Sequence, residues 1–358
     1  MVGLGASHLV NSLLCSLEKN KSLTIENIYL PQNGLLSNFK PANKKTLISF
    51  YHRFIPNSIS RFFECTFFSY KFNGKTTLLV LGDLPLRCNS PQILFVQQSL
   101  IFSKVSILQI RRLLKNLVSR FIFIINQKRV SAFIVQTSLL KIAIENRYPE
   151  TIGRVHVIPQ PPPLFLINNN KKRTGRISIF EKLNLFYPAA YYDHKNHKLL
   201  ELINLNLNEW PIQSLKLTIE NKYNPNPEVS WIHCSGELSY SQVIQEYSNA
   251  DALLFLSKNE SYGLPLIEAM YIGLPIVCPN LPYAQILCST QAIYFNPDEI
   301  NSLKKALADL QQRLKSGWWP DWSYQLSKIP LNWDITAENF FKIAKNLRNE
   351  NINNNCYT

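Results

Sequence analysis

Two glutamates, Glu260 and Glu268, stand eight residues apart around the Ser-Tyr-Gly-Leu-Pro turn of the stretch 258–279. An apolar, strand-like run leads into this stretch and another leads out of it. Gly263 in the turn has no side chain, so the backbone can come close to a ligand there. The two carboxylates are therefore placed on either side of a close-approach point.

The helix expected after the turn should start without a cap. Pro265 suits the first helical position, where a missing N–H costs nothing. Leu264 is then the expected N-cap, and leucine cannot cap. The N–H groups of Leu266 and Ile267 are consequently expected to lack internal partners. An uncapped helix start at the carboxyl end of a strand favours a phosphate.

The acids suggest what flanks such a phosphate. Glu268, one turn into the helix, could accept hydrogen bonds from the vicinal hydroxyls of a ribose, and Glu260 could reach a second polyol. Together they predict a nucleotide-sugar site. The simpler alternative is that both acids are solvated, with Glu268 favoured only by the helix dipole. The site hypothesis requires that no ion pair or packed side chain already fills the helix tip.

The composition restricts the partners. The chain has 358 residues, 46% hydrophobic and 17% charged, with 38 Lys and Arg against 24 Asp and Glu, a net charge of +14. Such an excess favours anionic partners: nucleic acid, nucleotide phosphates or an acidic membrane face. Seven scattered cysteines, with no Cys-x-x-Cys, indicate neither a disulfide framework nor a zinc knuckle. No apolar run reaches the roughly 18 residues of a spanning helix. We expect a cytoplasmic protein, soluble or peripheral on the inner face of the membrane.

The order of elements predicts an α/β protein of two domains, because strand-like runs alternate with amphipathic segments in both halves. The expected organisation is an N-terminal domain (1–166), a linker (167–176), a second domain (177–335), a helix (336–348) that returns to the first domain, and a polar tail (349–358). The expected strands lie at 23–30, 76–83, 92–97, 132–137, 154–159, 184–189, 215–220, 229–234, 252–257, 275–279 and 292–296.

The start of the chain departs from a doubly wound domain, which begins with a central strand and a Gly-rich turn. Gly3 and Gly5 supply the turn, but only Met1 and Val2 precede it. The N-terminal domain is therefore expected to lack its first strand or to have a short one.

The segment "NESYGLPLIEAMYIGLPIVCP" resembles the C-terminal signature of retaining glycosyltransferases of family 4, also called group 1, in which Glu, seven residues and Glu lie in an E-[SG]-[FY]-G-L-P-x-x-E-A-M frame. The resemblance is strong over 236–300 and loose before residue 75, and it extends to bacterial polysaccharide and O-antigen members. It implies the GT-B fold, with two Rossmann-like domains facing a cleft and the donor held mainly by the second.

The resemblance also implies roles. Glu268 would bind the ribose hydroxyls, Glu260 would lie near the transferred sugar, and Lys195 would bind the diphosphate. Gly236 lies where the base is received. The remaining donor-binding residues it implies are Ser261, Tyr262, Gly263 and Leu264 in the turn, with Gly3 and Gly5 facing the phosphates from the first domain.

Two positions depart from the family pattern. Many relatives carry an arginine about five residues before the lysine, where this chain has Ala190; His194, His197 or Arg176 could substitute. Many relatives also place a histidine after an N-domain strand, where this chain has Gln97 and Gln98. The expected catalysis therefore depends more on electrostatics than on an acid–base side chain.

The resulting expectation is a retaining, metal-independent glycosyltransferase without a cofactor. It would move a sugar from a nucleotide-sugar donor to a glycan or lipid-linked acceptor in cell-surface polysaccharide synthesis, and Lys195, the helix start and the glycine turn would stabilise the leaving diphosphate. The alternative is a catalytically weak relative that binds sugar nucleotide or glycan without turnover.

Two further segments bear on partners. Residues 103–123 are amphipathic, with Leu117, Val118 and Phe121 on the apolar arc and Arg120 on the basic one. They indicate either a crossover helix with a solvated basic face or a helix that docks on anionic lipid. The aromatic stretch 49–72 fits an acceptor groove, a membrane contact or buried packing.

Other functions fit less well. A nicotinamide oxidoreductase would need a third glycine where the chain has His8, and dispersed basic residues without a recognition motif argue against nucleic acid. His194 and His197 lie three residues apart, but they lack the further spacing of a metal site.

Overall fold

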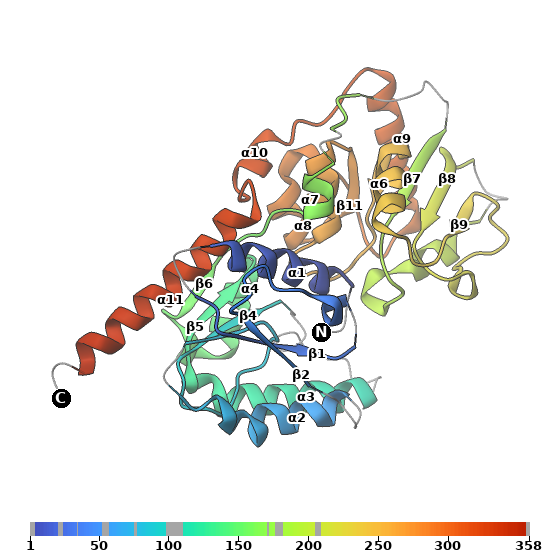
Figure 1. Ribbon diagram of the computed structural model, residues 1–358. Helices are drawn as coiled ribbons and strands as arrows, with labels where there is room; N and C mark the ends of the chain where they lie inside the picture. Colours follow the sequence, from blue (N-terminus) through green and yellow to red (C-terminus); the bar gives the residue numbers. More distant parts are fainter. Residues whose placement is uncertain are drawn as a thin grey trace. The chain divides into compact units, whose positions relative to one another are not determined.

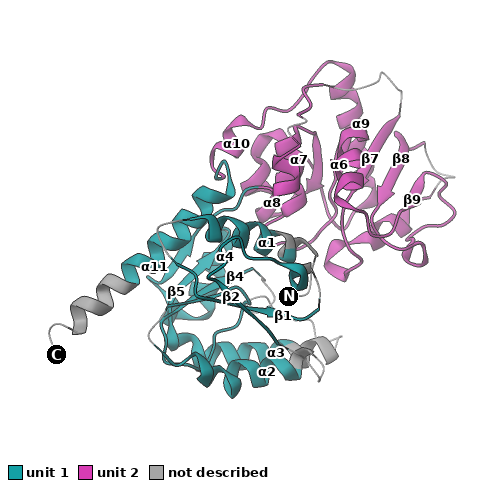
Figure 2. Cartoon of the chain, in the orientation of Figure 1, with its two compact units in different colours: residues 1–161, 330–358 teal, residues 162–329 magenta. Residues whose placement is uncertain are grey.

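A computed structural model describes residues 4–20, 24–33, 35–51, 57–74, 77–97, 110–169, 172–175, 182–204 and 209–355. The chain forms two compact units: unit 1 comprises Met1–Pro161 and Pro330–Thr358, and unit 2 comprises Pro162–Ile329 (Figure 2). Each unit contains its own buried apolar cluster. The predicted α/β class is confirmed, since parallel sheets and helices alternate in both units (Figure 1).

Unit 2 is built on one six-stranded sheet in which every neighbouring pair is parallel and the order is β12-β11-β10-β7-β8-β9. Strands β8 and β9 follow on one side of β7, and β10, β11 and β12 follow on the other side. The direction in which strands are added to the sheet therefore reverses between β7 and β10. Ligands of such sheets bind outside the carboxyl ends of the strands at this reversal. The strands are β7 (Leu183–Tyr187), β8 (Ile212–Leu217), β9 (Ile232–Cys234), β10 (Ala252–Leu254), β11 (Ile276–Pro279) and β12 (Ile293–Phe295).

Each strand of unit 2 overlaps a strand expected from the sequence. The central strands are short apolar runs because helices cover both faces of a parallel sheet; β10 and β11, for example, are buried at every position. The helices are α5 (Leu164–Ile167), α6 (Tyr240–Asn249), α7 (Leu264–Ile272), α8 (Pro282–Cys288), α9 (Ile300–Lys315) and α10 (Ser323–Ser327).

Unit 1 has a four-stranded parallel sheet of order β3-β4-β5-β6 and a separate parallel pair, β1 with β2. Five of these strands overlap expected ones, whereas β2 was not predicted. Its sequence, Leu-Ile-Ser-Phe-Tyr, is apolar, but three of its five residues are exposed and none is fully buried. The strands are β1 (Asn27–Pro31), β2 (Leu47–Tyr51), β3 (Leu78–Val80), β4 (Gln92–Val96), β5 (Val130–Val135) and β6 (Val155–Val157).

The helices of unit 1 are α1 (Leu4–Lys19), α2 (Asn57–Thr66), α3 (Ile110–Asn126), α4 (Ser138–Arg147) and α11 (Trp333–Asn355). Helix α11 is longer than the predicted 336–348 and includes much of the predicted tail. It packs against α1, and Phe340 makes an edge-to-face contact with Phe95 of β4 at 5.4 Å between ring centroids. The first described residue of α1 is Leu4, so Gly5 lies inside the helix rather than in a preceding turn. Gly3 lies outside the described residues.

Helix α3 covers most of the amphipathic segment, whose first residues lie outside the described part. Leu117, Val118 and Phe121 of the predicted apolar arc are 49%, 36% and 55% exposed. Among the side chains of α3 that the structure describes, from residue 116 on, the buried ones are Ile122, Phe123 and Asn126, and Phe123 packs on Phe133 and Tyr148. Part of the apolar surface of the helix is left uncovered.

Candidate functional site

The turn between β10 and α7 carries the predicted acids, and the helix begins one residue earlier than expected. Gly263 is the N-cap in the left-handed region (φ 77°, ψ 47°), and Leu264 is the first helical residue. A Cβ at Gly263 would lie 3.1 Å from Leu287 Cδ1 and 3.2 Å from Leu266 Cδ1. Glycine is therefore required both by the backbone conformation and by the packing around it.

The backbone N–H groups that lack a partner at the helix start are therefore not the ones the sequence predicted. The N–H groups of Leu266 and Ile267 donate to the carbonyl of Gly263 at 2.9 and 3.4 Å. Because the helix starts at Leu264, the donors left over move to the turn itself. Within the described part of the chain, no hydrogen bond uses the N–H groups of Gly263 and Leu264. These two amides, with the helix dipole behind them, keep the tip suited to an anion.

Glu268 is buried rather than solvated, with 7% of its surface exposed. The hydroxyl of Tyr247, on α6, donates a 2.7 Å hydrogen bond to its Oε2. Burial raises the pKa of Glu268 to about 7, and the Tyr247 hydrogen bond lowers it by less. Oε1 has no hydrogen-bond partner among the described residues. Such a carboxyl is poised to accept from ligand hydroxyls, which would restore the hydration that burial removes.

Lys195 and Glu260 form an ion pair, with Nζ 2.5 Å from Oε1 and both side chains less than 15% exposed. Lys195 follows β7 and Glu260 follows β10, so the pair joins the two loops at the reversal of strand order. Glu260 was expected to be open to a polyol and is instead already paired, because neighbouring parallel strands bring their carboxyl-end loops together.

Aromatic side chains hold the ion pair in place. The Tyr187 hydroxyl donates to the Lys195 carbonyl at 2.7 Å. The Lys195 ammonium lies 5.7 Å from the centroid of the Phe255 ring, within the range of a cation–π contact. The Tyr283 hydroxyl donates to the Ser257 carbonyl in the same loop. Burial raises the pKa of both tyrosines well above its usual value, so they remain neutral hydrogen-bond donors.

The two histidines beside Lys195 differ. The His194 ring stacks on Tyr192 at 5.7 Å, and its carbonyl accepts from the Lys258 N–H at 2.7 Å. His197 is 2% exposed, and burial lowers its pKa to about 4. Its burial and lowered pKa make His197 a less suitable substitute for the arginine than a solvent-exposed cation.

The other predicted site residues lie in unit 2, in unit 1 or outside the described residues. Gly236 follows β9 with φ 71°, and its N–H donates to the Ile219 carbonyl at 2.9 Å. Tyr262 is buried at the turn, next to Ser261. Unit 2 thus supplies the glutamates, Lys195, the turn and Gly236 from the carboxyl ends of its strands. Gly5 belongs to unit 1, and Arg176 and Gln98 lie outside the described residues.

Sequence reasoning missed Tyr247, the partner of Glu268. Its signal is indirect: a carboxyl predicted on a buried helix face needs a donor, and α6 precedes β10 and packs beside α7. A search for tyrosines on the apolar face of that helix could have found it.

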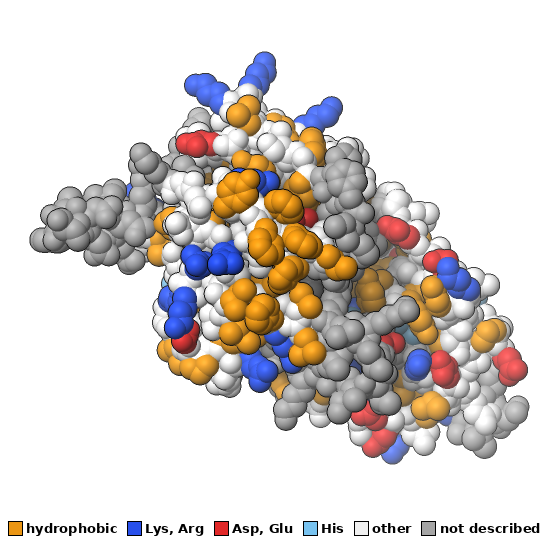
Figure 3. Space-filling view, turned by 90° about the horizontal axis from the view of Figure 1, so that it is seen from below, with side chains coloured by type: hydrophobic (Ala, Val, Ile, Leu, Met, Phe, Trp, Pro, Cys, Tyr) orange, Lys and Arg blue, Asp and Glu red, His pale blue; other side chains and the backbone are white. Residues whose placement is uncertain are grey.

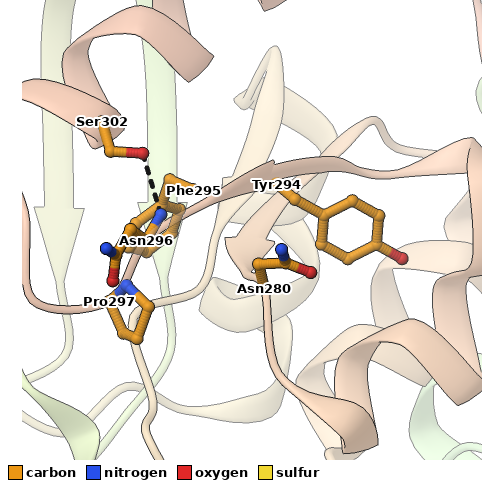
Figure 4. A pocket seen from close by; sticks show the side chains of 6 residues that line it. All are labelled: Asn280, Tyr294, Phe295, Asn296, Pro297 and Ser302. Atoms are coloured by element: carbon orange, nitrogen blue, oxygen red, sulfur yellow. Dashed lines mark hydrogen bonds between the residues drawn. The ribbon is translucent and has the colours of Figure 1, made fainter.

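A polar hollow lies on the same edge of the sheet, after β11 and β12 (Figure 4). It has a volume of about 310 Å³ and is lined by Asn280, Tyr294, Phe295, Asn296, Pro297 and Ser302. The Asn296 N–H donates to the Ser302 hydroxyl at 2.8 Å, which fixes the turn after β12. The Asn196 amide, next to Lys195, donates to the Pro297 carbonyl at 3.0 Å. This hydrogen bond therefore links the loop that carries Lys195 to the loop that lines the hollow.

Neither a metal cluster nor a spanning helix is found in the described ranges. No group of three or more His, Cys, Asp and Glu residues there is arranged to hold a metal ion. No helix that the structure describes combines the length and the apolar character needed to cross a membrane.

Residues 216–313 match the family model of the glycosyl transferases group 1. That span includes Gly236, both glutamates and the whole of α7, but not Lys195. The O-antigen chain mannosyltransferase RfbU of Salmonella typhimurium is 24% identical over 212 residues, which cover 54% of each chain. The serotype-specific mannosyltransferase WbdA of Escherichia coli is 24% identical over 151 residues, covering 41% of this chain and 17% of WbdA. The matches thus span about half or less of these relatives.

Solved structures show the fold. The lipopolysaccharide outer core galactosyltransferase WaaB superimposes with a TM-score of 0.54 at 13% identity, covering 96% of this chain and 95% of WaaB. The N-terminal domain of Candida albicans trehalose-6-phosphate phosphatase gives a TM-score of 0.58 at 12% identity, covering 96% and 93%. The chain has the GT-B architecture of two Rossmann-like units, as predicted.

Proposed function

We propose that this chain is a glycosyltransferase that moves a sugar from a nucleotide-sugar donor to a glycan or lipid-linked acceptor. The observation that carries the proposal is the buried Glu268 carboxyl one turn behind the Gly263 tip of α7. The match of residues 216–313 to the group 1 glycosyl transferases supports the same assignment.

The donor would bind along the carboxyl edge of the sheet in unit 2. The ribose hydroxyls would donate to Glu268, and the diphosphate would accept from the amides of Gly263 and Leu264. The base would lie toward Gly236, whose left-handed conformation and open surroundings leave room for it. Hydrogen bonds from two ribose hydroxyls would favour the ionised carboxylate and lower its raised pKa.

Transfer would depend on stabilisation of the leaving group. When the anomeric C–O bond breaks, its electron pair passes to the diphosphate, and positive charge develops on the sugar. Lys195 would share its ammonium between Glu260 and the diphosphate, and Glu260 would face the cationic sugar. We propose that the configuration is retained by attack on the same face, and that these groups make a metal ion unnecessary.

The names of the relatives suggest the first substrates to test. RfbU and WbdA are mannosyltransferases, and RfbU acts in O-antigen chains. A mannosyl nucleotide is therefore the first donor to test, and a bacterial surface polysaccharide is the expected product.

The test is donor binding by a Glu268→Ala variant. A panel of nucleotide sugars should raise the melting temperature of the wild-type chain by mass action, and the variant should lose most of that shift. Losing a charged acceptor costs about 1.5–3 kcal/mol, or roughly 10- to 150-fold in affinity. The matched control is Asp309→Ala, which removes an exposed carboxylate paired with Arg313 on α9 of the same unit. Normal donor binding by Glu268→Ala would refute the assignment.

A transfer assay then separates an active enzyme from a weak relative that only binds. With the donor that gives the largest shift and a lipid-linked or oligosaccharide acceptor, product should form, and its anomeric configuration is read by NMR. Donor binding without transfer or hydrolysis would favour the binding-only alternative.

A further inference from the structure

An exposed apolar surface lies on unit 1, over α2, the short 3-10 helix η2 (Phe68–Phe72) and α3. We call it the α2–α3 face. Figure 3 looks onto the side where these helices lie and shows hydrophobic side chains gathered there, with Lys and Arg around them. The two helices contact each other, so the surface is continuous. Its most prominent members, each more than a third exposed, are Phe63, Phe67, Phe68, Leu117, Phe121 and Ile124.

The aromatic part of the face is organised without being buried. The Phe63 ring lies 5.7 Å from the Phe67 ring and 6.4 Å from the Phe68 ring, and Phe62 lies 5.8 Å from Phe63. Phe67 and Phe68 are nevertheless 54% and 57% exposed. Contiguous exposed rings of this kind mark an interaction surface rather than a core.

The sequence of α3 is basic and contains no acid. Residues 110–129, which form α3 and the following 3-10 turn, contain six Lys and Arg residues and no acid. Lys128 and Arg129 are exposed at the end of that segment, where Lys128 pairs with Glu150 at 3.1 Å. Helix α2 carries one basic and one acidic residue, Arg61 and Glu64, and contributes no net charge.

The whole positive excess of the chain belongs to the unit that carries this face. Unit 1 has 23 Lys and Arg against 9 Asp and Glu, which gives +14; unit 2 has 15 of each, which gives zero. The donor site, which lies in unit 2, therefore does not explain the excess. An anionic partner of unit 1 does.

We propose that unit 1 docks onto an anionic lipid bilayer through the α2–α3 face. Aromatic and aliphatic side chains would enter the boundary between headgroups and acyl chains, while Lys and Arg would contact lipid phosphates. The combination of an apolar centre with a basic surround favours a bilayer over a polyanion such as nucleic acid, which would leave the apolar side chains in water. The proposal stands independently of the donor site.

Co-sedimentation with phosphatidylcholine vesicles, with and without phosphatidylglycerol, tests the docking on the full chain. The test variant Phe67→Asp/Phe121→Asp places two acids in the centre of the face. The control variant Ile286→Asp/Leu331→Asp makes the same change at residues 51% and 81% exposed elsewhere. The wild type and the control should bind phosphatidylglycerol vesicles, and the test variant should bind at least tenfold more weakly. Neutralisation of the exposed Lys71 on η2 by Lys71→Gln should weaken binding by about fivefold, most strongly at low salt.

Two measurements guard against a folding artefact. The test variant should keep the wild-type melting temperature and donor-induced shift, since it alters only exposed side chains of unit 1. Hydrogen exchange of the unmodified chain should slow within 57–72 and 110–126 when phosphatidylglycerol vesicles are added. Absent vesicle binding, equal binding by test and control variants, or protection only outside these segments would overturn the proposal. So would a dimer of the wild type that the test variant abolishes while vesicle binding persists. Each of these results leaves the donor assignment intact, because that rests on unit 2.

Discussion

Replacing Glu268 by glutamine isolates the energetic consequence of burying a carboxyl. Its pKa is about 7 in the folded chain against an ordinary value of 4.5. Because the folded pKa is the higher one, the native state binds the proton more tightly than the unfolded chain. The resulting stabilisation is fully present below pH 4.5 and is lost as the pH rises through 7. At 1.36 kcal/mol per pKa unit, the total is about 3 kcal/mol.

The assay is urea unfolding of the wild type and Glu268→Gln between about pH 5 and pH 8. Tryptophan fluorescence follows unit 2, which contains five of the six tryptophans. The unfolding free energy of the wild type minus that of the variant should fall by about 2.5 kcal/mol over this range. Other titrating groups, including His197, cancel in the difference. The Tyr247 hydroxyl can still donate to the glutamine amide oxygen, so packing is preserved.

A difference that stays flat with pH would show that Glu268 is ionised throughout, and the reasoning from burial would fail. Donor binding gives an independent check on the same group. If ribose hydroxyls donate to the carboxylate, wild-type affinity for a nucleotide sugar should rise as the pH passes through 7, while Glu268→Gln should bind weakly and without that rise. An intact nucleotide sugar is the right probe, because it lacks the terminal phosphate that titrates in a nucleoside diphosphate.

Two further substitutions test the site and its support. Lys195→Met should lower kcat for transfer by about 10²–10³-fold, because it removes the cation that stabilises the leaving diphosphate and leaves Glu260 unpaired. The control Lys216→Met breaks the Lys216–Glu246 pair of the same unit and should leave kcat unchanged. Equal effects of the two variants on kcat would contradict the role of Lys195. Gly273→Ala should lower the free energy of unfolding in urea by about 2–4 kcal/mol, because φ is 88° and the new Cβ would clash with the Arg173 carbonyl oxygen. The control is Gly175→Ala, whose Cβ would lie in open space. An unchanged unfolding free energy for Gly273→Ala would contradict the close contact.

The strands of unit 2 could be predicted from the sequence because each is a short apolar run bounded by turn residues. The position of Glu268 one turn after the end of a strand followed from the same pattern, whereas Lys195 was assigned only through the family resemblance. Strand β2 was not predicted although its sequence, Leu-Ile-Ser-Phe-Tyr, is apolar; in the structure three of its five residues are exposed.

The details of the site depended on tertiary contacts that periodicity does not report. The start of α7 moved by one residue because Gly263 adopts a left-handed conformation, which freed different amides from those expected. The Lys195–Glu260 pair joins residues 65 positions apart and forms only because β7 and β10 are neighbours. The sequence also left open whether the apolar arc of α3 is packed or exposed, since both arrangements share the same spacing.

The separation of charge between the units has a consequence for how the chain responds to its surroundings. A change in ionic strength should alter the encounter of the +14 unit with any negatively charged surface. The same change should affect the electrically balanced unit less, because its net charge is zero. Attachment and substrate capture could then be tuned by separate sets of substitutions in one polypeptide.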